Sequence, residues 1–190
     1  ALVENSNTNA TFGMVLCFGV YSILSASPGP RVYPRGFKRV SSPADEAVPL
    51  IANITEADII AAPDAIDWTA KGATTAVKDQ GQCGSCWAFS TTEGVESAVF
   101  RLTGKLPAPL STEELVSCDK IDGGCDGGDL PTAVRYLKKH GMASASDYPD
   151  RSSKSGRTGH CTWNDQRVAR VSGMSYAVPQ CKHGHCAADE

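Results

Sequence analysis

The segment at residues 80–90, QGQCGSCWAFS, constrains this chain most, because it places two thiols beside the expected start of a helix. The apolar spacing that follows predicts a helix from at or just before Cys86 to about Leu102, with Gly104 as its stop. Its predicted buried stripe is Trp87, Val95, Ala98, Val99 and Leu102. A cysteine at a helix start lies against unpaired backbone N–H groups, which favour the thiolate. The segment therefore makes Cys86 a candidate nucleophile, and the alternative is an inert buried thiol.

Composition bounds the remaining possibilities. The chain has 190 residues, of which 41% are hydrophobic, so it can form one domain with a packed core. Its 18 basic and 21 acidic residues are scattered and give a net charge of −3, so no basic stripe is available and no nucleic-acid partner is expected. Eight cysteines predict disulfides made on a secretory or lysosomal route. We therefore expect a lysosomal, vacuolar or secreted protein.

Two further helices are predicted downstream. A capping box at residues 111–114, with Leu110 and Leu115 as its hydrophobic staple, predicts a short helix. The next helix is predicted to begin at Asp129 or Leu130 and to end before Gly141. It has Pro131 in the first turn, inward-facing Ala133, Val134 and Leu137, and the basic residues Lys138, Lys139 and His140 in the last turn. Residues 167–175 form a possible strand.

The residues around Cys86 resemble the active-site segment of papain-like (cathepsin-type) cysteine peptidases, on the matching positions Gln80, Gly84, Ser85, Cys86, Trp87 and Phe89. The resemblance implies an α+β, two-lobed fold, of which residues 62–190 would supply the mostly helical N-terminal lobe. It also implies peptide-bond hydrolysis through a thioester, with Cys86 as nucleophile and Gln80 as oxyanion donor. It implies no cofactor and no metal.

The run at residues 123–128, GGCDGG, resembles the glycine loop of the same family, whose backbone binds an extended substrate. Taken alone, the run is equally well explained as a plain turn at a helix start. The resemblance implies substrate binding by Gly127 and Gly128, with Asp129 and Leu130 lining the pocket for the second residue before the cut. Leu130 predicts an apolar preference in that pocket, and Asp129 is favoured as a helix N-cap.

The family framework implies the disulfides Cys83–Cys125 and Cys118–Cys161, with Cys86 left free. An alternative is a redox dithiol, because Cys83 and Cys86 form a Cys-x-x-Cys pair at a helix start. The polar residues 74–82 argue against that alternative, since redox proteins of this kind place an apolar strand there.

Residues 181–186, CKHGHC, can be interpreted in two ways. A Cys181–Cys186 disulfide would close a short loop, whereas the two cysteines with His183 and His185 could hold zinc or copper. Four ligands packed so tightly cannot easily surround a tetrahedral ion, so the disulfide is favoured. We expect Cys17 to take no part in this network, and the four histidines are explained as surface residues.

Papain-like peptidases carry a base His and an orienting Asn roughly 130–150 residues after the nucleophile, and this sequence reaches Glu190 before that distance. The chain as written is therefore expected to be inactive by itself. The alternative is a non-catalytic remnant that acts as a binding fragment. Implied partners are protein or peptide substrates and cystatin-like or pro-segment inhibitors, and a monomer is expected.

Residues 1–61 are predicted to precede the catalytic domain. The stretch at residues 25–50 is interpreted as a linker because prolines interrupt it throughout. The apolar run at residues 15–24 is shorter than the roughly 20 residues that span a bilayer, so no membrane span is predicted. A signal peptide starting at Met14 and a degenerate pro-segment, suggested by the NATFGM run at residues 9–14, both remain open.

Overall fold

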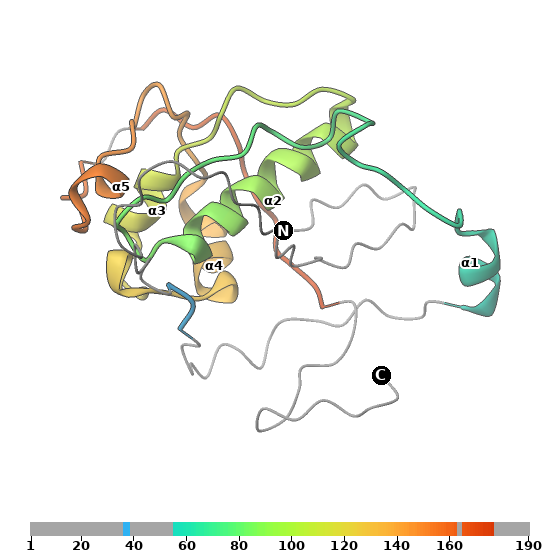
Figure 1. Cartoon of the computed structure of the whole chain (residues 1–190), viewed down its shortest axis with the longest axis horizontal. Coiled ribbons are helices and arrows are strands. Elements are labelled where there is room, and N and C mark those ends of the chain that lie inside the picture. Colours follow the sequence, from blue (N-terminus) through green and yellow to red (C-terminus); the bar gives the residue numbers. More distant parts are fainter. Residues whose placement is uncertain (1–35, 39–54, 163–164, 177–190) are drawn as a thin grey trace, which may run out of the picture.

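The computed structural model describes residues 36–38, 55–162 and 165–176 (Figure 1). Helices dominate this part of the chain, and its β pairing is limited to isolated bridges. The helical elements in chain order are α1 (Glu56–Ala61), α2 (Cys86–Thr103), α3 (Thr112–Cys118), the 3-10 turn η2 (Gly124–Asp126), α4 (Leu130–His140) and α5 (Ser152–Ser155). None of the helices in the described ranges is both long enough and apolar enough to cross a membrane.

The central element is α2, against which both α3 and α4 pack. It begins at Cys86 and ends at Gly104, whose φ of 74° is the left-handed conformation that suits a C-terminal glycine. Three members of the predicted stripe are buried, namely Trp87, Val95 and Ala98. The prediction was wrong for Leu102, which is 37% exposed, because the last turn of α2 extends past α3 and α4 (Figure 1).

The helix α4 has the predicted boundaries. Its N-cap is Asp129, whose side chain accepts a hydrogen bond from the backbone N–H of Leu130 at 2.8 Å. Ala133, Val134 and Leu137 are buried in the core that also contains Trp87, Val95, Leu110, Leu115 and Met142. This core lies between α2, α3 and α4, and its formation brings the start of α4 to the start of α2.

The predicted capping box at the start of α3 forms only in part. The Ser111 hydroxyl accepts from the N–H of Glu114 at 3.0 Å, but the Ser111 N–H donates to the carbonyl of Ala143 at 3.0 Å. The Glu114 carboxylate turns inward instead and accepts from the N–H of Ala143 at 2.7 Å and the hydroxyl of Tyr136 at 3.2 Å. Contacts with residues distant in the sequence therefore replace the hydrogen bond that the Glu114 side chain would make to the Ser111 N–H in a complete capping box.

Two more buried glutamates tie loops to the helices. The Glu96 carboxylate on α2 accepts from the N–H of Leu110 at 2.8 Å and pairs with the Lys78 ammonium at 2.6 Å. The Glu113 carboxylate on α3 accepts from the N–H groups of Arg151 and Ser152 at 3.1 and 2.9 Å. These backbone N–H groups have no acceptor within a helix or strand. Each carboxylate supplies the acceptor that a buried donor requires.

The structure corrects two expectations about the chain outside α2 to α4. The possible strand at residues 167–175 is absent from the described residues there, where Ala169 forms only an isolated bridge with Met142. A single isolated bridge does not stabilise a strand, which needs pairing with a neighbouring strand over several residues. Sequence analysis also missed α1, although Thr55 and Asp58 form a complete capping box at its start.

Candidate active site

Cys86 occupies the first position of α2 and is a free, half-buried thiol. Its N-cap, Ser85, makes no side-chain capping bond, so the first N–H groups of this long helix have no side-chain acceptor there. The N–H groups and the helix dipole favour negative charge at this end. A thiolate on Cys86 and an oxyanion formed beside it would both lie in that field.

Gln80 lies in the loop that leads into α2. Its side-chain amide donates to the carbonyl of Cys83 at 2.9 Å, and the same carbonyl accepts from the N–H of Ser85 at 2.8 Å. This carbonyl therefore anchors the glutamine amide next to the helix start. A primary amide carries two N–H donors, so the same group can donate to more than one acceptor.

A disulfide joins the loop that leads into α2 to the glycine loop at residues 123–128. Cys83 pairs with Cys125, and the N–H of Gly84 donates to the Cys125 carbonyl at 3.0 Å. The buried indole N–H of Trp87 donates to the carbonyl of Gly124 at 3.1 Å. The second pair, Cys118–Cys161, lies at the end of α3, and both pairings are those that the resemblance implies. Cys17, Cys181 and Cys186 lie outside the described residues.

Gly128 is packed so closely that no side chain fits. A Cβ atom there would lie 2.7 Å from the Asp122 carboxyl carbon and 2.7 Å from Cδ2 of the Trp87 ring. The backbone of the glycine loop is thereby pressed against the residue that follows the nucleophile.

The change Gly128→Ala is expected to lower the free energy of unfolding by about 1–3 kcal/mol, the usual cost of overpacking a rigid site. Urea denaturation of the 190-residue chain measures this effect. The matched control is Gly173→Ala, because a Cβ at Gly173 meets no atom of the described residues within 4 Å. Equal stability of the two variants would contradict the packing described for Gly128.

A short segment from the N-terminal part of the chain lies on the glycine loop. The N–H of Gly128 donates to the carbonyl of Gly36 at 2.8 Å, and the N–H of Lys38 donates to the carbonyl of Gly128 at 3.0 Å. The bridge is parallel, and Gly36 also lies directly against Gly84. Residues 36–38 thus pair with the backbone groups that the resemblance assigns to substrate, although the sequence predicted only a linker there.

Asp129 and Leu130 follow the glycines at the start of α4. Asp129 is buried, and its side chain is engaged as the N-cap, whereas Leu130 is half-buried. The pocket role of both residues remains a prediction.

The described histidines make contacts away from Cys86. His140 ends α4, with its ring 4.7 Å from the Tyr136 ring and its carbonyl accepting from Arg167 at 2.8 Å. It is therefore about 15 Å along the helix from Asp129, and it is half-buried rather than a plain surface residue. His160 is exposed, and its carbonyl accepts from Tyr148 at 3.2 Å. His183 and His185 lie outside the described residues.

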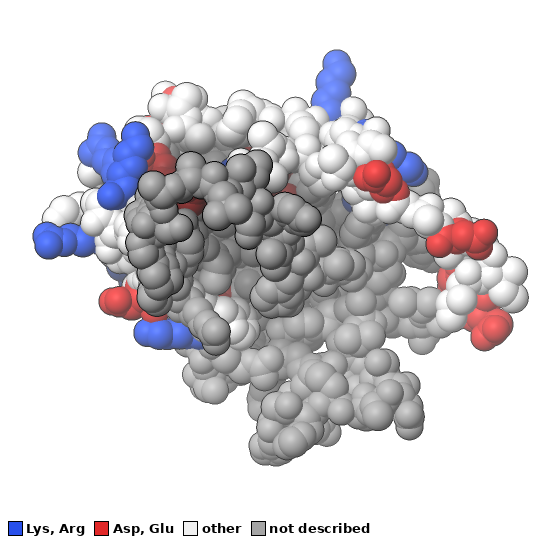
Figure 2. All heavy atoms as spheres, in the orientation of Figure 1, with Lys and Arg blue, Asp and Glu red and all other residues white. Residues whose placement is uncertain are grey.

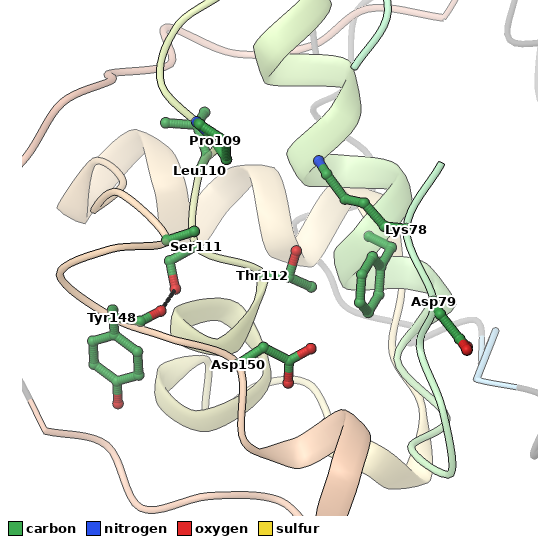
Figure 3. A pocket seen from close by; sticks show the side chains of 10 residues that line it. Lys78, Asp79, Pro109, Leu110, Ser111, Thr112, Tyr148 and Asp150 are labelled. Atoms are coloured by element: carbon green, nitrogen blue, oxygen red, sulfur yellow. Dashed lines mark hydrogen bonds between the residues drawn. The ribbon is translucent and has the colours of Figure 1, made fainter. Parts of the chain in front are cut away.

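A separate cavity of about 240 Å³ lies beside α2 and the start of α3 (Figure 3). Lys78, Phe89, Thr112 and Asp150 contribute to its lining, while Gln80, Cys86, Gly127 and Gly128 do not. At its edge Ser111 donates to the carbonyl of Tyr148 at 2.6 Å. The cavity is therefore distinct from the site around Cys86.

The charges of the described surface are mixed. Figure 2 shows basic and acidic side chains interspersed over the described part of one face, with acidic side chains of α1 near one edge. On that part of the face no continuous basic stripe forms, in line with the scattered charge of the sequence.

The helix-start thiol, the anchored glutamine and the disulfide-linked glycine loop lie together in the arrangement expected for the class of cysteine peptidases. The family model described as "Papain family cysteine protease" matches residues 62–186. The chain belongs to this papain family, and its described residues form part of the papain-like fold, consistent with the mostly helical N-terminal lobe.

Related proteins agree with that assignment. The chain is 44% identical to cysteine proteinase 15A of Pisum sativum over 124 residues, covering 60% of this chain and 33% of the relative. It is 50% identical to vignain of Phaseolus vulgaris over 93 residues, covering 48% of this chain and 25% of the relative. The chain thus spans about a third or less of these two curated relatives.

Solved structures of precursors are similar in fold. Recombinant stem bromelain precursor matches with a TM-score of 0.58 and 34% identity, covering 65% of this chain and 39% of that structure. Digestive procathepsin L 3 of Tenebrio molitor matches with a TM-score of 0.57 and 32% identity, covering 74% of this chain and 42% of that structure.

Proposed function

We propose that this chain supplies the nucleophile-bearing lobe of a cysteine endopeptidase that acts on proteins or peptides. The observation that carries the proposal is the free Cys86 thiol at the first position of α2, in the same loop as the anchored Gln80 amide. In the proposed reaction the Cys86 sulfur attacks the peptide carbonyl carbon, and the C–N bond breaks as the amine leaves with a proton. Water then hydrolyses the thioester and regenerates the thiol.

Gln80 and the backbone N–H of Cys86 are proposed to bind the oxyanion of the tetrahedral intermediate. Donors held in place before the reaction stabilise developing charge without reorganising, and this is the largest single catalytic effect in many enzymes. The hydrogen bond from Gln80 to the Cys83 carbonyl supplies such a fixed position.

The proposed reaction also needs a base that takes the thiol proton and returns it to the leaving amine. The described histidines contact other residues: His140 lies against Tyr136 and Arg167, and the His160 carbonyl accepts from Tyr148. We propose that a His in a second, β-rich lobe fills this role and that a polypeptide with only these 190 residues has little activity. A binding fragment without catalysis is the alternative.

Gly127 and Gly128 are proposed to bind the substrate backbone, with Leu130 favouring an apolar side chain two residues before the cut. Residues 36–38 support the idea that the N-terminal part acts as a pro-segment, because they already pair with Gly128. We place the boundary of the mature domain near Ala62. Cystatin-like inhibitors, a monomeric state and a lysosomal, vacuolar or secreted location belong to the same proposal.

The test of the oxyanion role is Gln80→Ala in a chimera that joins residues 62–190 to the β-rich lobe of a related enzyme. We expect kcat to fall about 10²- to 10³-fold, as when one oxyanion donor is removed. The matched control is Gln82→Ala, which removes an exposed amide from the same loop. Hydrolysis of a fluorogenic peptide measures both. A loss no larger than that of the control would refute the role of Gln80.

A further inference from the structure

Two buried acidic side chains come from the segment between α3 and the glycine loop. Asp119 is the residue that ends α3, and Asp122 lies three residues further on; they are 3% and 7% exposed. The Oδ2 atoms of both carboxyl groups are buried and have no hydrogen-bond donor among the described residues. Burial of two such oxygens without donors is costly, so the arrangement calls for a donor.

The other oxygen of each carboxyl group is satisfied. Oδ1 of Asp119 accepts from the N–H of Ile121 at 3.0 Å. Oδ1 of Asp122 accepts from the N–H of Asp129 at 3.0 Å and from the hydroxyl of Thr132 at 2.9 Å. Asp122 thus holds the first turn of α4, and its carboxyl carbon also abuts the position of Gly128.

One proton supplies the missing donor. If Asp122 is protonated on Oδ2, it donates to the Asp119 carboxylate, and both Oδ2 atoms are satisfied together. Burial raises the pKa of both groups, and the pKa of Asp122 rises to about 7. The two carboxyl groups also act on each other: Asp119 raises the pKa of Asp122, whereas Asp122 lowers the pKa of Asp119.

Charged groups of the neighbouring elements modify this pair. From α4, Arg135 lowers the pKa of Asp119, and Asp119 in turn raises the pKa of Tyr136. From the segment after α3, the Lys120 ammonium donates to the Ser117 carbonyl at 2.6 Å. Asp126 on η2 is exposed, and the nearby α2 side chain, Trp87, is uncharged. Burial remains the largest cause of the raised pKa.

We propose that Asp119 and Asp122 share one proton and form a pH-dependent clamp, which holds Gly128 and the start of α4 in acid and loosens them near neutral pH. Asp122 is then a positioning residue for the segment whose substrate role rests on the proposed function. When the proton leaves to solvent, the two Oδ2 atoms carry negative charge without a donor, and the repulsion between the carboxylates pushes Asp122 away from Asp119 and so disturbs Gly128 and the first turn of α4.

The sign of the effect follows from linkage. The folded protein binds this proton more tightly than the unfolded chain, in which an Asp has a pKa of about 3.9. The stabilisation from the clamp is therefore complete below about pH 4 and is lost as pH rises through about 7. Stability should thus fall between pH 5 and pH 8.

The test is Asp122→Asn in the full 190-residue chain, because the asparagine amide donates to Asp119 at every pH and keeps an oxygen for Asp129 and Thr132. The melting temperature of the parent is expected to drop by about 5 °C more than that of the variant between pH 5 and pH 8. At pH 5 the two proteins should melt within about 2 °C of each other. The matched control is Asp126→Asn, which removes an exposed acid of the same loop and should keep the pH dependence of the parent.

Hydrogen exchange locates the effect. The protection factor of the Asp129 amide is expected to fall at least about tenfold from pH 5 to pH 8 in the parent and in Asp126→Asn, and to stay constant in Asp122→Asn. Parallel pH profiles of the parent and Asp122→Asn in both measurements would overturn the clamp. Neither measurement uses substrate, so this outcome is independent of whether Cys86 and Gln80 carry out catalysis.

Discussion

Replacement of Cys86 by alanine is expected to lower kcat of the chimera described above by about 10⁵- to 10⁶-fold, as loss of a nucleophile does in related triads. The expected result has a simple cause: without sulfur no thioester forms, and the oxyanion donors alone give only residual rate over water. Single-turnover hydrolysis of a peptide ester measures the acylation step directly. The 190-residue chain without the second lobe should hydrolyse the substrate at about the same rate as this variant.

Folding must be unchanged for this comparison to count. Cys86 takes part in neither disulfide of the described residues and is only half-buried, so Cys86→Ala should shift the free energy of unfolding by less than about 1 kcal/mol. Substantial Cys86-dependent hydrolysis by residues 62–190 alone would contradict the need for a base from another lobe. Unchanged activity of the Cys86→Ala chimera would contradict the proposed nucleophile.

The largest effect on stability is expected for Glu114→Leu. Glu114 is 1% exposed, and its carboxylate accepts from the Ala143 N–H and lies 3.4 Å from the Arg167 guanidinium. Leucine would leave that guanidinium and N–H buried without this acceptor, which typically costs about 3–5 kcal/mol. Because domains are stable by only about 5–15 kcal/mol, the variant should be largely unfolded or melt far below the parent.

Graded substitutions separate charge from shape. Glu114→Gln keeps an acceptor for the Ala143 N–H but removes the charge beside Arg167, so it should cost less than Glu114→Leu. Glu56→Gln on α1 is the control, because Glu56 is exposed, and it should change the free energy of unfolding by less than about 0.5 kcal/mol. Urea midpoints at pH 7 measure the series. A Glu114→Leu variant as stable as the control would contradict the structural role of Glu114.

Several local features could be predicted because short-range signals determine them. The start of α2 at Cys86 and the Asp129 cap of α4 depend on apolar spacing, an N-capping side chain and a terminal glycine. Leu102 was predicted wrongly because spacing cannot reveal how far along a helix its neighbours extend. The candidate site was found from motifs, whereas the burial of Asp119, Asp122 and Glu114 was not predicted, since acidic residues are ordinarily exposed.

The sequence by itself determined the family resemblance, the start of α2 at Cys86 and the cysteines that the family framework pairs, because each depends on residue types at fixed spacing. Only the tertiary structure decided that residues 36–38 pair with Gly128, and that Glu114 turns from its capping box to Ala143. It also decided that Asp119 and Asp122 are buried, each with an Oδ2 atom that has no donor among the described residues. The physical reason is that burial and hydrogen-bond partners arise from contacts between distant segments, which local spacing does not encode.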